Sequence, residues 1–181
     1  MIGCESMIVR SGMLTLVIGG SASGKSEYAE QHVMSLNGAR IYIATMEPFG
    51  KEAADRISKH RQMRKNKGFE TIECYTGLKD VRVPPGSNVL LEDLGNLMAN
   101  EIFSPAGKGP EAVRTGIEAL IPACAHLTIV TNEIFSGGTD CTEETLYYMR
   151  ELAAINRHIA ARADRVTEIV CGIPNILKQT K

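Results

Sequence analysis

Three features of this sequence predict an α/β fold in which helices cover both faces of a mainly parallel sheet. Short apolar runs rich in strand-forming residues alternate along the chain with stretches typical of helices. A glycine-rich loop joins the first apolar run to the first helical stretch. The chain has 181 residues, of which 44% are hydrophobic, and that is enough for one substantial core. Strands that alternate with helices form βαβ units, which build parallel sheets.

Each expected strand is a short apolar run that polar or turn-forming residues bound on both sides. The expected strands are 14–18, 40–45, 69–73, 88–92, 127–131 and 166–171. A Gly/Pro turn follows the last of them, so we expect it to pair with a further strand at 173–177.

The stretches between these strands are rich in helix formers and are bounded by glycine and proline. Asp140 and Glu143 have the spacing of a capping box, which predicts the start of a long helix that ends near Arg162. Gly107, Gly109 and Pro110 break the chain before another helix. The helix after the glycine-rich loop is expected to begin at Ser26 and to continue over 27–36. The remaining expected helices are 52–66, 94–103 and about 111–124.

The glycine-rich loop fits the Walker A pattern G-x-x-x-x-G-K-[ST] and lies between a strand and a helix, as that motif requires. Its glycines let backbone N–H groups point at phosphate oxygens, Lys25 supplies a charge for the terminal phosphates, and the Ser26 hydroxyl can ligate Mg²⁺. The fold is therefore predicted to be that of a P-loop NTPase with a RecA-like sheet. The expected nucleotide-binding residues of the loop are Gly19, Gly20, Ser21, Ala22, Ser23, Gly24, Lys25 and Ser26.

Ligands of such sheets collect at the carboxyl ends of the strands, so the residues that follow each strand are further candidates. Glu92 ends an apolar strand in the Walker B manner and is expected to help hold Mg²⁺, with Asp93 as the competing candidate. A solvated acid in the first turn of the next helix is the alternative interpretation of Glu92.

Two other strand ends carry polar groups that can reach a ligand. Asn132 and Glu133 follow the fifth strand and can contact substrate, metal or an attacking hydroxyl, although helix capping explains them equally well. Ala44, Thr45 and Met46 end the second strand, which we expect to lie beside the phosphate loop, in contact with nucleotide.

The expected helix at 52–66 has few apolar anchors and places Glu52, Arg56, His60 and Arg64 on one face. Neighbouring cations disfavour the imidazolium form of a histidine, which keeps a lone pair available for attack on phosphorus. A solvated charged helix is the simpler interpretation. The other histidines, His32, His126 and His158, are isolated in the sequence and have no supporting pattern.

The net charge of −1, the absence of Trp and the 5% aromatic content do not favour nucleic-acid binding or an anionic membrane surface. No segment is long enough to span a bilayer. The five cysteines are scattered and form no C-x-x-C pair, which predicts buried or partly buried free thiols and a reducing cytoplasm. Residues 1–12 are expected to be an extension of a single domain at 13–181.

From Met13 onward the chain resembles the bifunctional adenosylcobinamide kinase/adenosylcobinamide-phosphate guanylyltransferase family of cobalamin biosynthesis. The resemblance rests on five segments that occur in the same order as in the family. They are the phosphate loop with its helix start (19–30), Tyr-Ile-Ala-Thr (42–45), Arg-Ile-Ser-Lys-His-Arg (56–61), Leu-Leu-Glu-Asp-Leu (90–94) with Asn100, and Val-Thr-Asn-Glu (130–133).

The resemblance implies two reactions at one site, phosphorylation of adenosylcobinamide by a nucleoside triphosphate and transfer of GMP from GTP to the product. It implies that His60 carries GMP covalently between the two half-reactions, that Arg61, Arg64, Glu73 and Glu92 contact nucleotide, and that ATP, GTP and Mg²⁺ are used. It further implies a corrinoid substrate and a homo-oligomer, specifically a trimer. Two other functions fit the phosphate loop: a P-loop kinase for a different small alcohol, and a non-catalytic nucleotide-sensing module.

Overall fold

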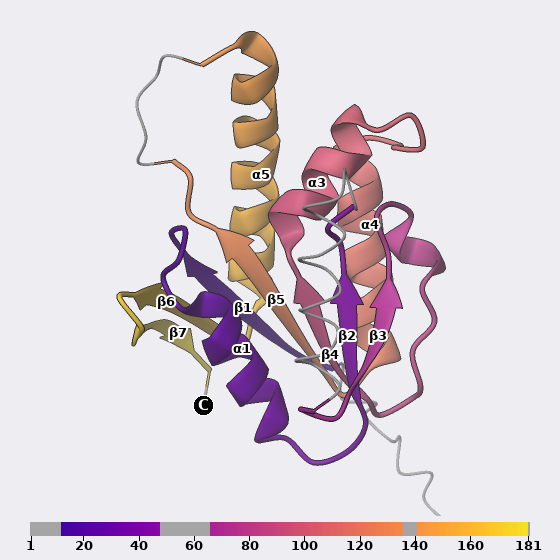
Figure 1. Cartoon of the computed structure of the whole chain (residues 1–181), viewed down its shortest axis with the longest axis vertical. Helices are drawn as coiled ribbons and strands as arrows, with labels where there is room; N and C mark the ends of the chain where they lie inside the picture. The colour runs from indigo at the N-terminus through magenta and orange to yellow at the C-terminus, as the bar shows by residue number, and fades with distance from the viewer. Residues whose placement is uncertain (1–11, 48–65, 136–140, 181) are drawn as a thin grey trace, which may run out of the picture.

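The computed structural model describes residues 12–47, 66–135 and 141–180, and these form a seven-stranded sheet with helices on both faces (Figure 1). The strand order is β3-β2-β4-β5-β1-β6-β7, and every strand pair is parallel except β6 with β7. The strands are β1 (Met13–Gly19), β2 (Arg40–Ala44), β3 (Phe69–Glu73), β4 (Asn88–Glu92), β5 (His126–Asn132), β6 (Arg165–Val170) and β7 (Ile173–Gln179).

Helix α1 lies on one face of the sheet, and three other helices pack on the opposite face (Figure 1). The helices are α1 (Lys25–Met34), α3 (Leu94–Phe103), α4 (Pro110–Leu120) and α5 (Glu143–Arg162), with short 3₁₀ helices η1 (Leu78–Asp80) and η2 (Ile121–Ala123). Helix α4 shows how the sequence directs this packing, since its buried residues Val113, Gly116, Ile117 and Leu120 have the spacing of a single helix face.

The centre of the sheet is buried from both sides. Val89, Leu90 and Leu91 of β4 have no solvent-exposed surface, because successive side chains of a strand point to opposite faces and helices cover both. A continuous apolar run of this kind is what a central parallel strand requires. The strand ends, where the chain turns into loops and helices, are left to carry polar groups.

All of the expected strands are present, and the expected pairing of β6 with a strand across the Gly/Pro turn is confirmed. Three helices differ from expectation in their boundaries. Helix α1 spans Lys25–Met34, whereas a helix that begins at Ser26 and continues to residue 36 is expected. The helix expected over 111–124 ends at Leu120 and continues only as the 3₁₀ turn η2, in which Pro122 has no N–H to extend the α-helical ladder. The N-cap of α5 is Thr142, whose hydroxyl accepts from the Thr145 N–H, instead of Asp140.

The expectation that β2 lies directly beside the phosphate loop is wrong at the level of strand order. Two strands, β4 and β5, separate β2 from β1, which carries the loop. Strand order depends on which strands pair with one another in the sheet, and the amino-acid composition of β2 does not indicate which neighbours it pairs with.

The four cysteines in the described part of the chain are free thiols, and Cys74 and Cys124 are buried as expected. Cys171 is exposed and therefore contradicts the expectation of burial, because it occupies the tight turn between β6 and β7 at the surface. Within residues 12–47, 66–135 and 141–180, no helix combines the length and the apolar character needed to cross a bilayer.

Candidate nucleotide-binding site

The phosphate loop leaves β1 at Gly19 and enters α1 at Lys25, and its glycines are required by geometry. Gly24 has a φ of 90°, in the left-handed region that side chains disfavour. At Gly19 a Cβ atom would lie 2.5 Å from the Ser23 Oγ and 2.7 Å from the backbone oxygen of Ile169. The loop can therefore fold tightly against β6 only because position 19 has no side chain.

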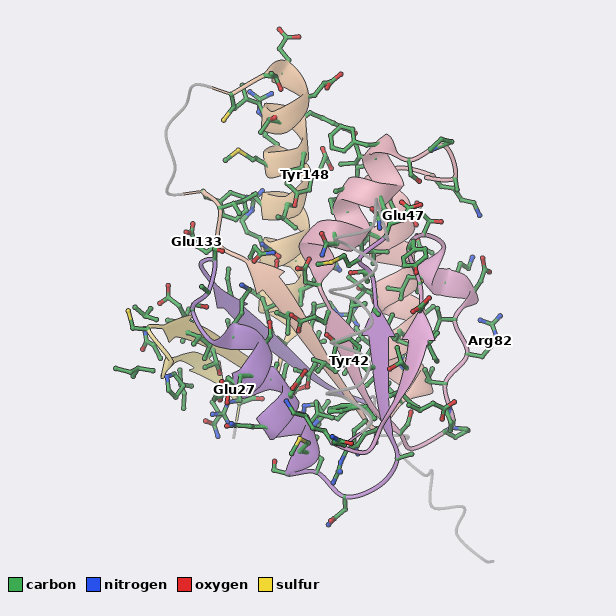
Figure 2. All side chains as sticks on the ribbon, viewed as in Figure 1. Glu27, Tyr42, Glu47, Arg82, Glu133 and Tyr148 are labelled. Carbon is green, nitrogen blue, oxygen red and sulfur yellow. The ribbon has the colours of Figure 1, made fainter. Side chains whose placement is uncertain are left out.

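Backbone hydrogen bonds from two distant segments hold this loop in place. The Glu133 N–H donates to the Gly19 carbonyl at 2.9 Å, and the Gly172 N–H donates to the Ser23 carbonyl at 2.8 Å. Figure 2 shows Glu133 beside the turn between β1 and α1. The loop is thus held in position by β5 on one side and by the β6–β7 turn on the other.

Lys25 points inward although it is charged. Its side chain lies over the loop and donates from Nζ to the Gly20 carbonyl at 3.0 Å, and the residue is only 8% exposed. With one hydrogen bond among the described residues, this buried ammonium group retains donors for an anion. The lysine is therefore placed to bind phosphate oxygens that enter the loop.

Ser26 and Glu92 meet although 66 positions separate them in the sequence, and the serine hydroxyl donates to the Glu92 Oε1. The other carboxylate oxygen of Glu92, Oε2, is buried and has no hydrogen-bond partner among the described residues. Burial raises the pKa of Glu92 to about 7, and the Ser26 hydrogen bond and the Lys25 charge only partly oppose this. A hydroxyl beside a carboxylate oxygen without a partner is the donor set that Mg²⁺ prefers.

Asp93, the competing candidate, has a structural role. It is the N-cap of α3, where one carboxylate oxygen accepts from the Asn96 N–H at 2.7 Å and the other accepts from the Asn132 side-chain amide at 3.3 Å. Burial raises the pKa of Asp93, and these hydrogen bonds oppose that effect. Both oxygens of Asp93 are engaged, whereas Oε2 of Glu92 has no hydrogen-bond partner among the described residues, so Glu92 is the better-placed candidate to hold a metal ion.

Thr45 is fully buried and links β2 to the start of α3. Its hydroxyl oxygen is 2.8 Å from both the carbonyl and the N–H of Asp93. The Asn100 side-chain amide donates to the Thr45 carbonyl at 2.9 Å and to the Tyr75 carbonyl at 3.0 Å. Thr45 and Asn100 therefore position the strand ends. Thr45 is a candidate in the sequence because it follows a strand, whereas the only sequence signal for Asn100 is the family resemblance.

The remaining candidates lie along the same carboxyl edge of the sheet. Ala44 pairs with Glu92 in the sheet register, and Met46 follows it half-buried. Asn132 contacts Asp93 as described above, and the Glu133 carboxylate accepts from the Phe135 N–H at 3.0 Å. Glu73 ends β3 and accepts from the Tyr75 hydroxyl at 2.9 Å.

His60, Arg61 and Arg64 lie outside the described residues, as does the expected helix at 52–66 that carries them. The nearest described contact on its carboxyl-terminal side is the ion pair between Lys67 and Glu30. Since Glu30 belongs to α1, this pair joins the start of the 67–73 segment to the helix that follows the phosphate loop.

Taken with the sheet, this loop and its facing carboxylate define a P-loop nucleotide-binding protein. Residues 15–177 match the family described as cobinamide kinase / cobinamide phosphate guanyltransferase, and the chain belongs to that family. The bifunctional adenosylcobalamin biosynthesis protein CobU of Escherichia coli is 32% identical over 178 residues, which cover 89% of this chain and 97% of that protein. The corresponding CobU of Salmonella typhimurium is 31% identical, with the same coverage.

Two further similarities agree with this assignment. The bifunctional adenosylcobalamin biosynthesis protein CobP of Pseudomonas aeruginosa is 29% identical and matches 92% of this chain and 98% of its own. Among solved structures, the flagellar accessory protein FlaH of Methanocaldococcus jannaschii superposes with a TM-score of 0.50 over 94% of this chain and 80% of its own, at 13% identity. At that identity the likeness concerns the fold alone, and it supports the RecA-like architecture.

Proposed function

We propose that this protein phosphorylates adenosylcobinamide with a nucleoside triphosphate and then transfers GMP from GTP to the adenosylcobinamide phosphate. Family membership supplies the two activities. The observation that carries the proposal in this chain is the contact of Ser26 with Glu92 beside the inward-pointing Lys25. That arrangement is suited to a nucleoside triphosphate whose terminal phosphates enter the loop.

In this proposal Lys25 exchanges its hydrogen bond to the Gly20 carbonyl for the phosphate oxygens and neutralises charge that develops there during transfer. The Ser26 hydroxyl and the free Oε2 of Glu92 would hold Mg²⁺, directly or through water. When bound, Mg²⁺ spreads negative charge over the phosphates and lowers the barrier to displacement.

We infer from the family resemblance that His60 is the nucleophile of the guanylyl transfer. A ring nitrogen attacks the α-phosphorus of GTP, the bond to the bridging oxygen breaks, and pyrophosphate leaves with that electron pair. A phosphate oxygen of the corrinoid then attacks the same phosphorus and returns the electron pair to the imidazole. Arg61, Arg64 and Glu73 are assigned to nucleotide contact on the same basis. Asn132 and Glu133 are assigned to contact with substrate, metal or an attacking hydroxyl, because they follow β5 at the carboxyl edge of the sheet.

We also propose that the protein works as a homo-oligomer, specifically a trimer, in the cytoplasm. Strand β7 is the edge of the sheet. Three of its large apolar side chains, Ile173, Ile176 and Leu177, are exposed to solvent, as is Val170 at the end of the neighbouring strand β6. Apolar surface of this kind favours contact with another chain. The free thiols of the described cysteines suit a reducing compartment.

The deciding experiment is incubation with GTP that carries label at either the α- or the γ-phosphate, followed by denaturation and measurement of label bound to protein. We expect acid-labile, base-stable label from the α-position alone, lost in His60→Ala and kept in His158→Ala. His158 is a suitable control because it lies on α5 and pairs with Glu118, away from the phosphate loop.

Two other outcomes would contradict parts of the proposal. Corrinoid phosphorylation without protein-bound label would identify a plain P-loop kinase. Nucleotide binding without turnover of either substrate would identify a sensing module.

A further inference from the structure

Two histidines that are distant in the sequence converge at the end of the sheet opposite the phosphate loop. His32 lies in the last turn of α1, and His126 is the first residue of β5. Their Nε2 atoms are 3.5 Å apart, the ring centroids are 5.2 Å apart, and the ring planes are inclined at 72°. The two rings therefore approach through their nitrogen-bearing edges and do not stack.

The separation of the two nitrogens is long for a hydrogen bond and suitable for a shared ligand. Donor–acceptor distances in protein hydrogen bonds cluster at about 2.9–3.0 Å. Two imidazoles bound to one tetrahedral ion at about 2.0–2.1 Å place their nitrogens roughly 3.3–3.4 Å apart. From this geometry we propose that His32 and His126 form a binding site for a divalent transition-metal ion of the Zn²⁺ or Ni²⁺ class.

Hydroxyl groups of the neighbouring strands can complete such a site. The Thr15 Oγ1 is 2.9 Å from the His126 Nε2. Thr128, the register partner of Thr15 in the sheet, has a buried Oγ1 with no hydrogen-bond partner among the described residues. No cluster of three His, Cys, Asp or Glu side chains suited to a metal occurs in the described part of the chain. Two imidazoles would thus be supplemented by hydroxyl or water oxygen.

The charge state of both histidines favours metal binding. Burial, followed by the proximity of His32, lowers the pKa of His126 to about 4, and burial followed by the Arg165 charge lowers the pKa of His32. Neutral imidazole is the form that ligates metal, so little competition from protons is expected near pH 7. His126 is 7% exposed, whereas His32 is half-buried and so keeps part of its surface in contact with solvent.

Two charged groups near the two histidines have opposite effects on the binding of a cation. The Arg165 guanidinium opposes a cation, but it is engaged with the Tyr28 hydroxyl at 3.2 Å and the Thr167 hydroxyl at 3.3 Å. The Asp164 charge raises the pKa of His126 and so favours a cation. Its carboxylate also accepts from the Leu14 N–H at 2.8 Å.

A bound ion would tie the last turn of α1 to β5. The first turn of the same helix carries Lys25 and Ser26, so the site would stabilise the element on which the phosphate loop depends. This site is separate from the proposed enzymatic activity, and it can be tested without substrate.

The test is thermal unfolding of the untagged chain, stripped with EDTA and dialysed, in the absence of nucleotide and with increasing NiCl₂. At about 100 times the dissociation constant, the midpoint should rise by roughly 5–10 °C for a domain of this size. His32→Gln and His126→Gln should each remove this rise, while His158→Gln should keep it. MgCl₂ at equal concentration should produce no histidine-dependent rise, because Mg²⁺ selects oxygen ligands.

Loss of the rise in both variants would support the site. His32→Gln is informative even if His126→Gln fails to fold, since His32 is only half-buried. No rise in the wild-type chain, or a rise that survives in His32→Gln, would overturn the proposal.

Discussion

Removal of the buried carboxylate of Glu101 should destabilise the protein far more than removal of an exposed one. Glu101 lies in α3 and is 1% exposed. Its two oxygens accept from the Gly77 N–H at 2.7 Å and the Lys108 N–H at 2.8 Å, so a single side chain fastens two loops to the helix. The first of these loops follows β3, where Glu73 is assigned to nucleotide contact.

The expected loss of unfolding free energy follows from the number of hydrogen bonds that the substitution removes. A hydrogen bond to a charged group contributes about 1.5–3 kcal/mol, and Glu101→Ala removes two and leaves two N–H donors to find water. Because both loops are partly accessible, we take the lower value and expect a loss of about 3 kcal/mol. Glu101→Gln keeps the volume and one acceptor but turns an NH₂ donor toward the second N–H, so a loss of about 1.5 kcal/mol or more is expected.

These losses are measurable by thermal or urea unfolding. For a domain of this size, Glu101→Ala should lower the midpoint by roughly 6–12 °C and Glu101→Gln by about half as much. The control is Glu111→Ala, which breaks an exposed ion pair with Arg114 and should change the unfolding midpoint far less than Glu101→Ala does, because solvent screens exposed pairs. The amides of Gly77 and Lys108 should exchange faster in Glu101→Ala. An Ala variant no less stable than the Glu111 control would refute the reasoning.

Three other predictions concern the phosphate loop and its surroundings. Gly19→Ala should lower stability by about 1–3 kcal/mol in urea unfolding, because the new Cβ must displace backbone on the adjacent strand, and an unchanged midpoint would contradict this. Lys25→Ala should weaken nucleotide binding roughly 10- to 100-fold by calorimetry with an intact fold, since it loses a charged phosphate contact, and wild-type affinity would argue against the site. Exposed Cys171 should react with iodoacetamide at pH 8 well before Cys74 or Cys124, because burial raises the pKa of each of those thiols to about 11, and equal rates by mass spectrometry would be inconsistent with this.

The elements whose identity depends on nearby residues could be predicted from the sequence. The sequence predicts the apolar run of β4 and the following helix α3 with the observed bounds. The reason is that hydrophobic periodicity and apolar runs are properties of consecutive residues. The phosphate loop was expected for the same reason, since its glycines, lysine and serine are consecutive. The N-cap of α5 differs from the expected one because competing caps a few residues apart differ little in local propensity. The early end of α4 has another cause, the missing N–H of Pro122.

Contacts between distant residues could not be predicted. In the sequence, Glu92 and Asp93 are competing candidates for a metal ligand. Only the structure shows that Asp93 caps a helix, while Glu92 faces Ser26 with one oxygen that has no partner in the described part of the chain. His32 and His126 are likewise isolated in the sequence, although folding brings their nitrogens 3.5 Å apart.

By itself, then, the sequence determined the fold class, the phosphate loop and the family to which the chain belongs, because each rests on local pattern or on short motifs in order. The tertiary structure alone decided the strand order, the partner of each carboxylate and the meeting of the two histidines. Those features depend on which surfaces pack together once the chain has closed upon itself, and packing joins residues that no local pattern relates.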